Sequence, residues 1–194
     1  MTEKRPTRDD ALRLVHDHIQ NENLRKHCLA VEAVLRHFAE HFGEDVEKWG
    51  TIGLVHDLDW EEHPDEHCTY TRRILTEEGW PDDYIRAVMS HAWGMFTDEK
   101  PEHTMEKVLY TIDELTGLIT ATALVRPSKS ILDMKAKSVR KKWKESGFAA
   151  GANREIIEQG AEMLGMELSE VIEHTLKGMQ TVADDLGLAG EAGD

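Results

Sequence analysis

The sequence predicts an all-α fold, and three observations support this prediction. Apolar residues recur every three or four positions along nearly the whole chain, which is the spacing of one buried helix face. No run of alternating β-branched residues suggests a half-buried strand. Residues that favour helix ends, such as Thr7, Gly43, Gly79 and Pro81, separate the periodic segments. We therefore expect a compact bundle of many helices.

Capping residues and apolar stripes define the first four helices. Thr7, with Asp10 three positions later, is typical of a capped helix start. The second helix keeps its apolar stripe until Gly43, a residue that favours the left-handed conformation of a helix end. Pro64 suits the first turn of the fourth helix, which stops at Gly79. These helices are expected at about residues 7–19, 24–42, 46–57 and 64–79.

The remaining helices follow from similar signals. Pro81 opens a fifth helix that carries His91 at its end, and Arg126-Pro127 stops a long helix with Asp113 in its middle. We expect these and the C-terminal helices at about residues 81–91, 104–125, 130–144, 153–164 and 169–186. Neither an internal repeat nor a long linker interrupts them, so we predict a single domain over residues 1–194.

The composition excludes several classes of protein. A chain of 194 residues that is 40% hydrophobic and 31% charged can build a core and is not expected to be disordered. A formal net charge of −15 argues against a nucleic-acid binder, which needs an electropositive face. The longest apolar stretches are far short of the ~20 residues that a membrane span needs, and no secretory signal is visible. Cys28 and Cys68 are expected as core residues in a reducing cytoplasm.

The adjacent pair His56-Asp57, at the end of the apolar run TIGLV, predicts a metal site. An unpaired buried carboxylate is costly, so it usually finds a cation or takes up a proton. Neutral imidazole and ionised carboxylate are the ligands that a borderline divalent metal prefers. Other candidates lie on or beside apolar faces of separate helices, and six ligands are enough for two ions bridged by a carboxylate or water. The candidate ligands are His27, His56, Asp57, His67, His91 and Asp113.

Alternatives exist for single members of this set. His63 competes with His67, because it lies four residues earlier in the same loop. Asp59 is expected to orient a ligand imidazole, with an exposed loop position as the alternative. We assign the other histidines to solvated faces or loops, namely His16, His18, His37, His41, His103 and His174.

The order His…His-Asp…Asp, given by His27, His56-Asp57 and Asp113, resembles the HD-domain superfamily of metal-dependent phosphohydrolases. The resemblance covers about residues 20–125, with residues 126–194 as a C-terminal helical extension. Members with two metals carry two further histidines, which His67 in HCTYTRRIL and His91 in SHAWG match. The resemblance implies an HD-domain bundle that binds one or two divalent ions, of which Fe, Mn, Zn, Ni, Co and Mg are candidates. The segments DELTGLITATALVRPSKS and KSVRKKWK further resemble a bacterial branch described only in general terms as hydrolases.

Two departures from the family pattern bear on the substrate. Many relatives have a lysine three residues after the HD pair, where this chain has Trp60. The Gly-Tyr-Pro extension of cyclic-dinucleotide phosphodiesterases is absent, and Thr71 replaces the glycine usual after the third histidine. A cyclic-dinucleotide substrate is therefore not expected, and another group must meet the charge of a substrate phosphate.

The basic segment 126–144 is the source we predict for that charge. It holds eight Lys or Arg residues and a single acid, Asp133. Arg126 and Lys129 directly follow the helix of Asp113, and we predict that they bind substrate phosphate if the loop folds back. The segment could equally bind the acidic remainder of the chain or a second subunit. Lys141 and Lys142 are expected on a solvated face.

Together these features predict a cytoplasmic hydrolase that cleaves a phosphoester or phosphoanhydride of a small molecule, with a nucleotide as the favoured substrate. The catalytic residues are expected to be Asp57, which holds or bridges the metals, and Asp59 beside it. Two alternatives remain open: a non-catalytic module that binds a nucleotide as a sensor, and a di-iron oxygenase like a few relatives. Neither a nucleic acid nor a membrane is an expected partner.

Overall fold

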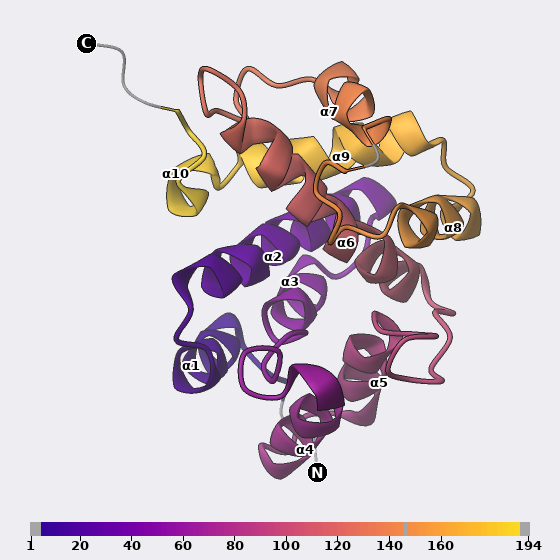
Figure 1. Cartoon of the computed structure of the whole chain (residues 1–194). Coiled ribbons are helices and arrows are strands. Elements are labelled where there is room, and N and C mark those ends of the chain that lie inside the picture. The colour runs from indigo at the N-terminus through magenta and orange to yellow at the C-terminus, as the bar shows by residue number, and fades with distance from the viewer. Residues whose placement is uncertain (1–4, 146, 191–194) are drawn as a thin grey trace.

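The structure is a computed structural model that describes residues 5–145 and 147–190. It confirms the all-α prediction: the described residues form helices and connecting loops, with isolated β-bridges only, such as that between Ser130 and Ala189. Figure 1 shows the bundle, with α4 and α5 towards one end and α7, α9 and α10 towards the other. The helices are α1 (Arg8–His18), α2 (Glu22–Phe42), α3 (Val46–Leu54), α4 (Thr69–Glu77), α5 (Asp82–Ser90), α6 (Thr104–Leu124), α7 (Ala136–Trp143), α8 (Arg154–Leu164), α9 (Leu168–Gln180) and α10 (Ala183–Leu186), with the short 3₁₀ helix η1 (Pro64–Glu66) before α4.

The helix ends follow local chemistry where a capping residue is present. Thr7 and Asp10 form a reciprocal capping box at the start of α1, as the sequence predicts. Asn21 caps α2 by accepting hydrogen bonds from two backbone N–H groups. At the other end of α2, Gly43 has φ +70°, a conformation that glycine adopts without the steric cost of a side chain.

The core is centred on α2, which packs against α3, α6 and α9 (Figure 1). Phe38 of α2, Trp49 of α3 and Leu109 of α6 are among its fully buried side chains. The apolar faces that predict the helices are therefore the faces that meet in this core. Because α2 contacts three partners over its length, residues on different turns of α2 reach different parts of the bundle.

The C-terminal helices are packed closely onto this core. At Gly178 of α9, an added Cβ would lie 2.7 Å from the Cα of Val34 on α2. At Gly160 of α8, an added Cβ would lie 1.9 Å from the Thr111 hydroxyl oxygen on α6. Gly178 is required because the α2 backbone approaches too closely for a side chain, and Gly160 is required because the Thr111 side chain fills the space that a Cβ would occupy. The division of the chain into domains stays a prediction.

Four helices differ from the sequence prediction. The expected helix 64–79 is divided into η1 and α4, so His67 lies between them rather than within a helix. Helix α3 ends at Leu54, so the HD pair lies in the turn that follows it. The expected helix 130–144 begins only at Ala136, because the Ile131 backbone N–H donates to the Leu188 carbonyl, 2.9 Å away. The expected helix 169–186 is divided into α9 and α10. Gln180, at the end of α9, donates a side-chain hydrogen bond of 2.8 Å to the Ile131 carbonyl.

The helices are amphipathic rather than uniformly apolar. Within the part of the chain that the structure describes, none is long and apolar enough to cross a lipid bilayer. Cys28 and Cys68 are both buried, free thiols.

Candidate metal centre

Four of the predicted ligands converge from three elements. His27 comes from α2, His56 and Asp57 from the turn after α3, and Asp113 from the middle of α6. The His27 Nε2 atom lies 3.2 Å from His56 Nε2 and 2.9 Å from Asp113 Oδ1. The Asp57 Oδ2 atom lies 3.6 Å from His27 Nε2 and 3.5 Å from His56 Nε2. We call these four residues the inner group.

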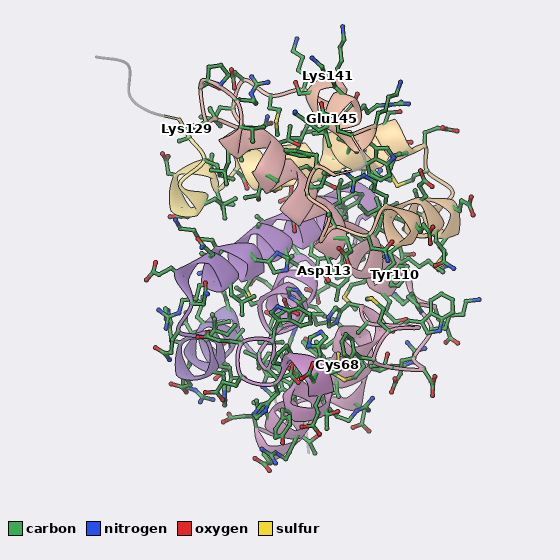
Figure 2. The ribbon with its side chains drawn as sticks, in the orientation of Figure 1. Cys68, Tyr110, Asp113, Lys129, Lys141 and Glu145 are labelled. Carbon is green, nitrogen blue, oxygen red and sulfur yellow. The ribbon has the colours of Figure 1, made fainter. Side chains whose placement is uncertain are left out.

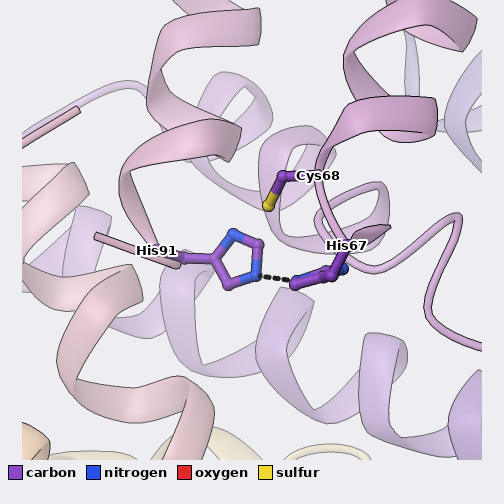
Figure 3. A group of neighbouring side chains, drawn as sticks. All are labelled: His67, Cys68 and His91. Carbon is purple, nitrogen blue, oxygen red and sulfur yellow. Dashed lines mark hydrogen bonds between the residues drawn. The ribbon is translucent and has the colours of Figure 1, made fainter. Parts of the chain in front are cut away.

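A second cluster lies on the other side of the Asp57 carboxylate. His67, between η1 and α4, and His91, just after α5, have their Nε2 atoms 2.9 Å apart (Figure 3). The Asp57 Oδ1 atom is 3.5 Å from His67 Nε2 and 3.6 Å from His91 Nε2. We call His67 and His91 the outer pair. One Asp57 oxygen therefore faces the inner group and the other faces the outer pair.

Hydrogen bonds on the far side of each ring orient the four histidines. The Nδ1 atoms of His56 and His91 lie 2.7 Å and 2.5 Å from the carbonyl oxygens of Gly53 and Val88. A carbonyl only accepts, so both Nδ1 atoms carry the proton and both Nε2 lone pairs are free. The Thr116 hydroxyl donates to the Asp113 carbonyl and lies 3.3 Å from His27 Nδ1. Because the hydroxyl proton is already donated, the Thr116 oxygen can only accept from His27, so the His27 Nδ1 atom also carries the proton.

Asp59 orients the fourth ring. Its Oδ1 atom lies 2.8 Å from His67 Nδ1, and its Oδ2 atom accepts the Thr71 N–H at 2.9 Å. In return, the Asp59 N–H donates to the Thr71 hydroxyl at 3.2 Å. The carboxylate is thus fixed in place by α4 while it accepts the His67 proton. This is the arrangement in which a carboxylate sets the tautomer of a metal-binding imidazole and raises its basicity.

The donor set fits divalent metal ions. With protons on the Nδ1 atoms, each group turns only nitrogen lone pairs and carboxylate oxygens towards its centre, with no hydrogen between them. Ligands at ~2.0–2.2 Å from an ion lie roughly 3.0–3.5 Å apart in tetrahedral or octahedral geometry. The separations within each group match that spacing. Cations would therefore relieve a repulsion that these side chains otherwise have among themselves.

The electrostatics of the site keep its carboxylates ionised. Burial by itself raises the pKa of Asp57, but the neighbouring His56 and His91 outweigh burial and lower the pKa below its usual range. Burial also opposes the ionisation of Asp113, but His27 and His56, when their rings are doubly protonated, donate hydrogen bonds to it and lower its pKa well below its ordinary value. Both acids are ready to bind a cation near neutral pH.

The histidines respond in the opposite direction. Burial lowers the pKa of His56, but the charge of Asp57 and a hydrogen bond to Asp113 raise it above its ordinary value. For His91, burial is likewise outweighed by its interaction with Asp57, and the pKa rises. Without metal, these carboxylates therefore attract protons to the rings, and metal binding must displace them.

Comparison with protein families agrees with this geometry. A model of the HD domain matches residues 24–118, a segment that contains all six predicted ligands. This match covers 95 of the 194 residues and identifies that segment as an HD domain. The superfamily consists in general of metal-dependent phosphohydrolases. Comparisons with curated proteins and with solved structures gave no significant match.

Cys68 lies beside the outer pair of the HD domain. Its sulfur is within 4.8 Å of ligand nitrogens of His67 and His91, and Figure 3 shows its side chain near the two rings. Burial, together with the charge of Asp59, raises the pKa of this thiol far above its usual range. Cys68 is therefore expected to remain a neutral thiol. Because the thiolate is the form that binds metals, we do not expect Cys68 to be a ligand.

The two ligand groups open into a cleft of about 810 Å³. Asp57, His67 and Asp113 lie at its base, and the described residues along its walls include neither lysine nor arginine. Two further acids, Glu61 and Glu114, line it as well. The remaining lining residues are polar or apolar: Asn21, Asn23, Leu24, His27, Trp60, Pro64, His91, Ala92, Met95, Phe96, Gly117, Ala149, Gly151 and Ala152. The cleft is therefore acidic where it meets the metal centre.

An aromatic wall stands beside the outer pair. Trp60 and Phe96 contact the His67 ring edge to face, with centroids 4.9 Å and 5.3 Å away. The two side chains are still 42% and 43% exposed, and Met95 next to Phe96 is 47% exposed. Trp60 occupies the position where many HD domains have lysine. An apolar face thus replaces a positive charge at the rim of this cleft.

Arg126 and Lys129 are not among the described residues that line the cleft, and their binding of substrate phosphate stays a prediction. Arg126 donates to the Asp133 carboxylate at 2.7 Å and to the Ser138 hydroxyl at 3.1 Å. The loop after α6 turns towards the C-terminal residues and pairs with them, rather than folding back along α6. Figure 2 shows Lys141 at α7 and Lys129 beside α10, both apart from Asp113 in the middle of the bundle.

Other residues differ from their predicted surroundings. His63 stacks on the Tyr70 ring, with centroids 3.6 Å apart, and belongs to neither ligand group. Glu114 was not singled out by the sequence, although it follows Asp113 directly on α6 and lines the cleft. It accepts the Asn153 N–H at 2.9 Å, and burial raises its pKa. No pattern in the sequence distinguishes it from the other acids on helix faces.

Proposed function

We propose that this protein is a metal-dependent phosphohydrolase that cleaves a phosphoester of a small molecule. The observation that supports the proposal best is the position of Asp57 between two sets of histidines. One carboxylate oxygen is directed to the inner group and the other to the outer pair. A carboxylate shared in this way is suited to holding two ions next to each other, the arrangement used for in-line displacement at phosphorus.

The residues of the site have distinct roles in this proposal. His27, His56 and Asp113 hold the inner ion, His67 and His91 hold the outer ion, and Asp57 joins the two. Asp59 accepts the His67 Nδ1 proton and so keeps the Nε2 lone pair directed into the site. Divalent ions in such sites supply an activated water and positive charge for the phosphoryl oxygens.

The charge of the cleft narrows the substrate class. With neither lysine nor arginine among its described lining residues, the centre must itself neutralise the phosphate. Further phosphate groups would lie near Glu61 and Glu114 and would be repelled. A monoester is therefore favoured over a polyphosphate. Trp60 and Phe96 offer exposed ring faces for an apolar or aromatic group, which favours a nucleoside monophosphate among small phosphoesters.

A substrate screen tests the proposal. Purified protein, loaded in turn with Mn²⁺, Co²⁺, Ni²⁺, Fe²⁺, Zn²⁺ or Mg²⁺, is assayed for phosphate release from nucleoside mono-, di- and triphosphates and from sugar phosphates. We expect turnover of monoesters, lost in Asp57→Ala and retained in Asp65→Ala, which changes an exposed acid of η1. Binding of nucleotides without any turnover would instead favour a sensor. Oxygen consumption with Fe²⁺ and no phosphate release would favour an oxygenase.

A further inference from the structure

A cluster of three histidines lies outside the metal centre, where α2 and α9 pack together. His37 and His41 are one turn apart on α2, and His174 lies opposite them on α9. The sequence assigns all three to solvated faces, but His37 and His174 are only partly exposed. His37 Nε2 and His174 Nδ1 are 3.0 Å apart, and the rings of His41 and His174 have centroids 4.3 Å apart.

From this geometry we propose that His37, His41 and His174 form a second, separate binding site for a borderline divalent metal such as Zn²⁺ or Ni²⁺. Residues at positions i and i+4 of a helix lie on the same face, so His37 and His41 can hold one ion together. Nitrogens bound to one tetrahedral ion are roughly 3.3 Å apart. The 3.0 Å between His37 and His174 is close to that value and to the 3.2 Å between His27 and His56.

The packing of the two helices fixes two of the three ligands. Gly178, one turn after His174 on α9, lies against the backbone of Val34, about one turn before His37 on α2. This close approach holds the helix faces in register, so His37 and His174 meet without a change in backbone. His41 is exposed, and the proposal requires its side chain to rotate so that a ring nitrogen reaches the same point.

The surroundings keep the rings in the form that binds metal. Burial lowers the pKa of His37, and Lys177 lowers it further. Burial also lowers the pKa of His174, with contributions from His41 and His37. Neutral imidazole is the ligand form. The acids near the cluster are Glu40 on α2 and Glu170 on α9, whose charges oppose that of Lys177.

The site would join the helix that carries His27 to the C-terminal helices. Because an ion there binds the folded protein only, it should raise the thermal unfolding midpoint. It should not require an intact HD centre, since none of its ligands belongs to that centre.

Metal titration of the full chain tests this proposal. Protein whose HD centre is already loaded is dialysed against increasing Ni²⁺, and bound metal is counted per chain in wild type, His41→Ala and His174→Ala. The control is His16→Ala, an exposed histidine on α1. We expect one additional ion per chain in wild type and His16→Ala, with a rise in the unfolding midpoint.

Both cluster variants should bind that ion at least about tenfold more weakly, since losing even a hydrogen-bond partner of a ligand costs roughly 10–100-fold. Circular dichroism checks their fold, and His41→Ala changes only an exposed side chain. Equal binding of the additional ion by wild type and His41→Ala, or an equal loss in His16→Ala, would overturn the proposal.

Discussion

Replacement of Asp59 by Asn should weaken the outer metal and leave the inner one in place. The carboxylate accepts two hydrogen bonds, from His67 Nδ1 at 2.8 Å and from the Thr71 N–H at 2.9 Å. An amide of the same shape has a single acceptor oxygen, so its NH₂ group must face one of these donors. If that donor is His67, the ring is driven to carry its proton on Nε2, where it blocks the metal. If it is Thr71, a buried N–H loses its partner.

The expected loss of metal affinity follows from the effect of carboxylates that orient ligand imidazoles in other metal sites. Loss of a carboxylate that orients a ligand imidazole typically costs 10–100-fold in metal affinity, or about 1.4–2.7 kcal/mol. Asp59 accepts a hydrogen bond from His67, and neither a hydrogen bond nor an ion pair joins it to the described inner ligands, so the loss should be confined to one ion.

The assay is a calorimetric titration of metal-free protein with Mn²⁺ or Zn²⁺, supported by metal analysis after dialysis. Asp65→Asn, an exposed change in the same loop, serves as the matched control. We expect two binding events in wild type and in the control, with only one of the two events shifted in Asp59→Asn. Equal weakening of both events, or no change in either, would refute this account of Asp59.

Four further predictions concern substrate binding, the pH dependence of metal affinity, the pH dependence of stability, and a buried ion pair. Trp60→Ala should raise KM several-fold with a smaller change in kcat, and Trp60→Phe should restore KM, because the ring face is expected to contact the substrate; steady-state kinetics check this. Metal affinity should increase as pH rises above about 6.5, the ordinary pKa of histidine. Burial lowers the pKa values of His56 and His91, but their interaction with Asp57 outweighs burial and raises both values. Metal binding must therefore displace a proton from each ring. By the same shifts, charged His56 and His91 stabilise the metal-free protein fully below pH 6.5, and this stability is lost as pH rises through their folded-state pKa values; denaturant unfolding at several pH values measures it. Glu32→Ala should destabilise the fold by about 3 kcal/mol, because it removes the buried acid that pairs with Arg8 and Arg36. This value is near the low end for a broken buried ion pair, since the two arginine side chains keep 44% and 23% exposure. Urea unfolding of Glu32→Ala beside Glu32→Gln measures the change.

The helices that the sequence predicts accurately are those whose ends are decided locally. The Thr7 capping box and Gly43 act through residues within one turn, and both ends lie where the sequence places them. The helix expected over 130–144 was too long, because the Ile131 N–H bonds the Leu188 carbonyl, 57 positions away. A pairing that distant leaves no trace in local periodicity, so only the folded structure reveals it.

The same distinction applies to functional residues. The convergence of candidate ligands such as His56 and Asp57 was predictable, because a charged pair at the end of an apolar run is costly without a partner. The partner of Arg126 was not predictable, because a run of basic residues does not indicate where each side chain points; in the structure, Asp133, seven positions away, accepts its hydrogen bond. The contact between His37 and His174 joins positions 137 apart, and neither neighbourhood in the sequence distinguishes it from a solvated face.

The most direct test of the central claim is the number of metal ions per chain in wild type, His67→Ala and Asp57→Ala. The protein is loaded with one metal species and dialysed, and metal analysis is combined with the phosphate-release assay on the same samples. Our account predicts two ions in wild type, one ion and strongly reduced turnover in His67→Ala, and loss of both metal and activity in Asp57→Ala, because Asp57 faces both ligand groups. The same number of ions in all three proteins would contradict the assignment of Asp57 as the shared ligand of a two-metal centre.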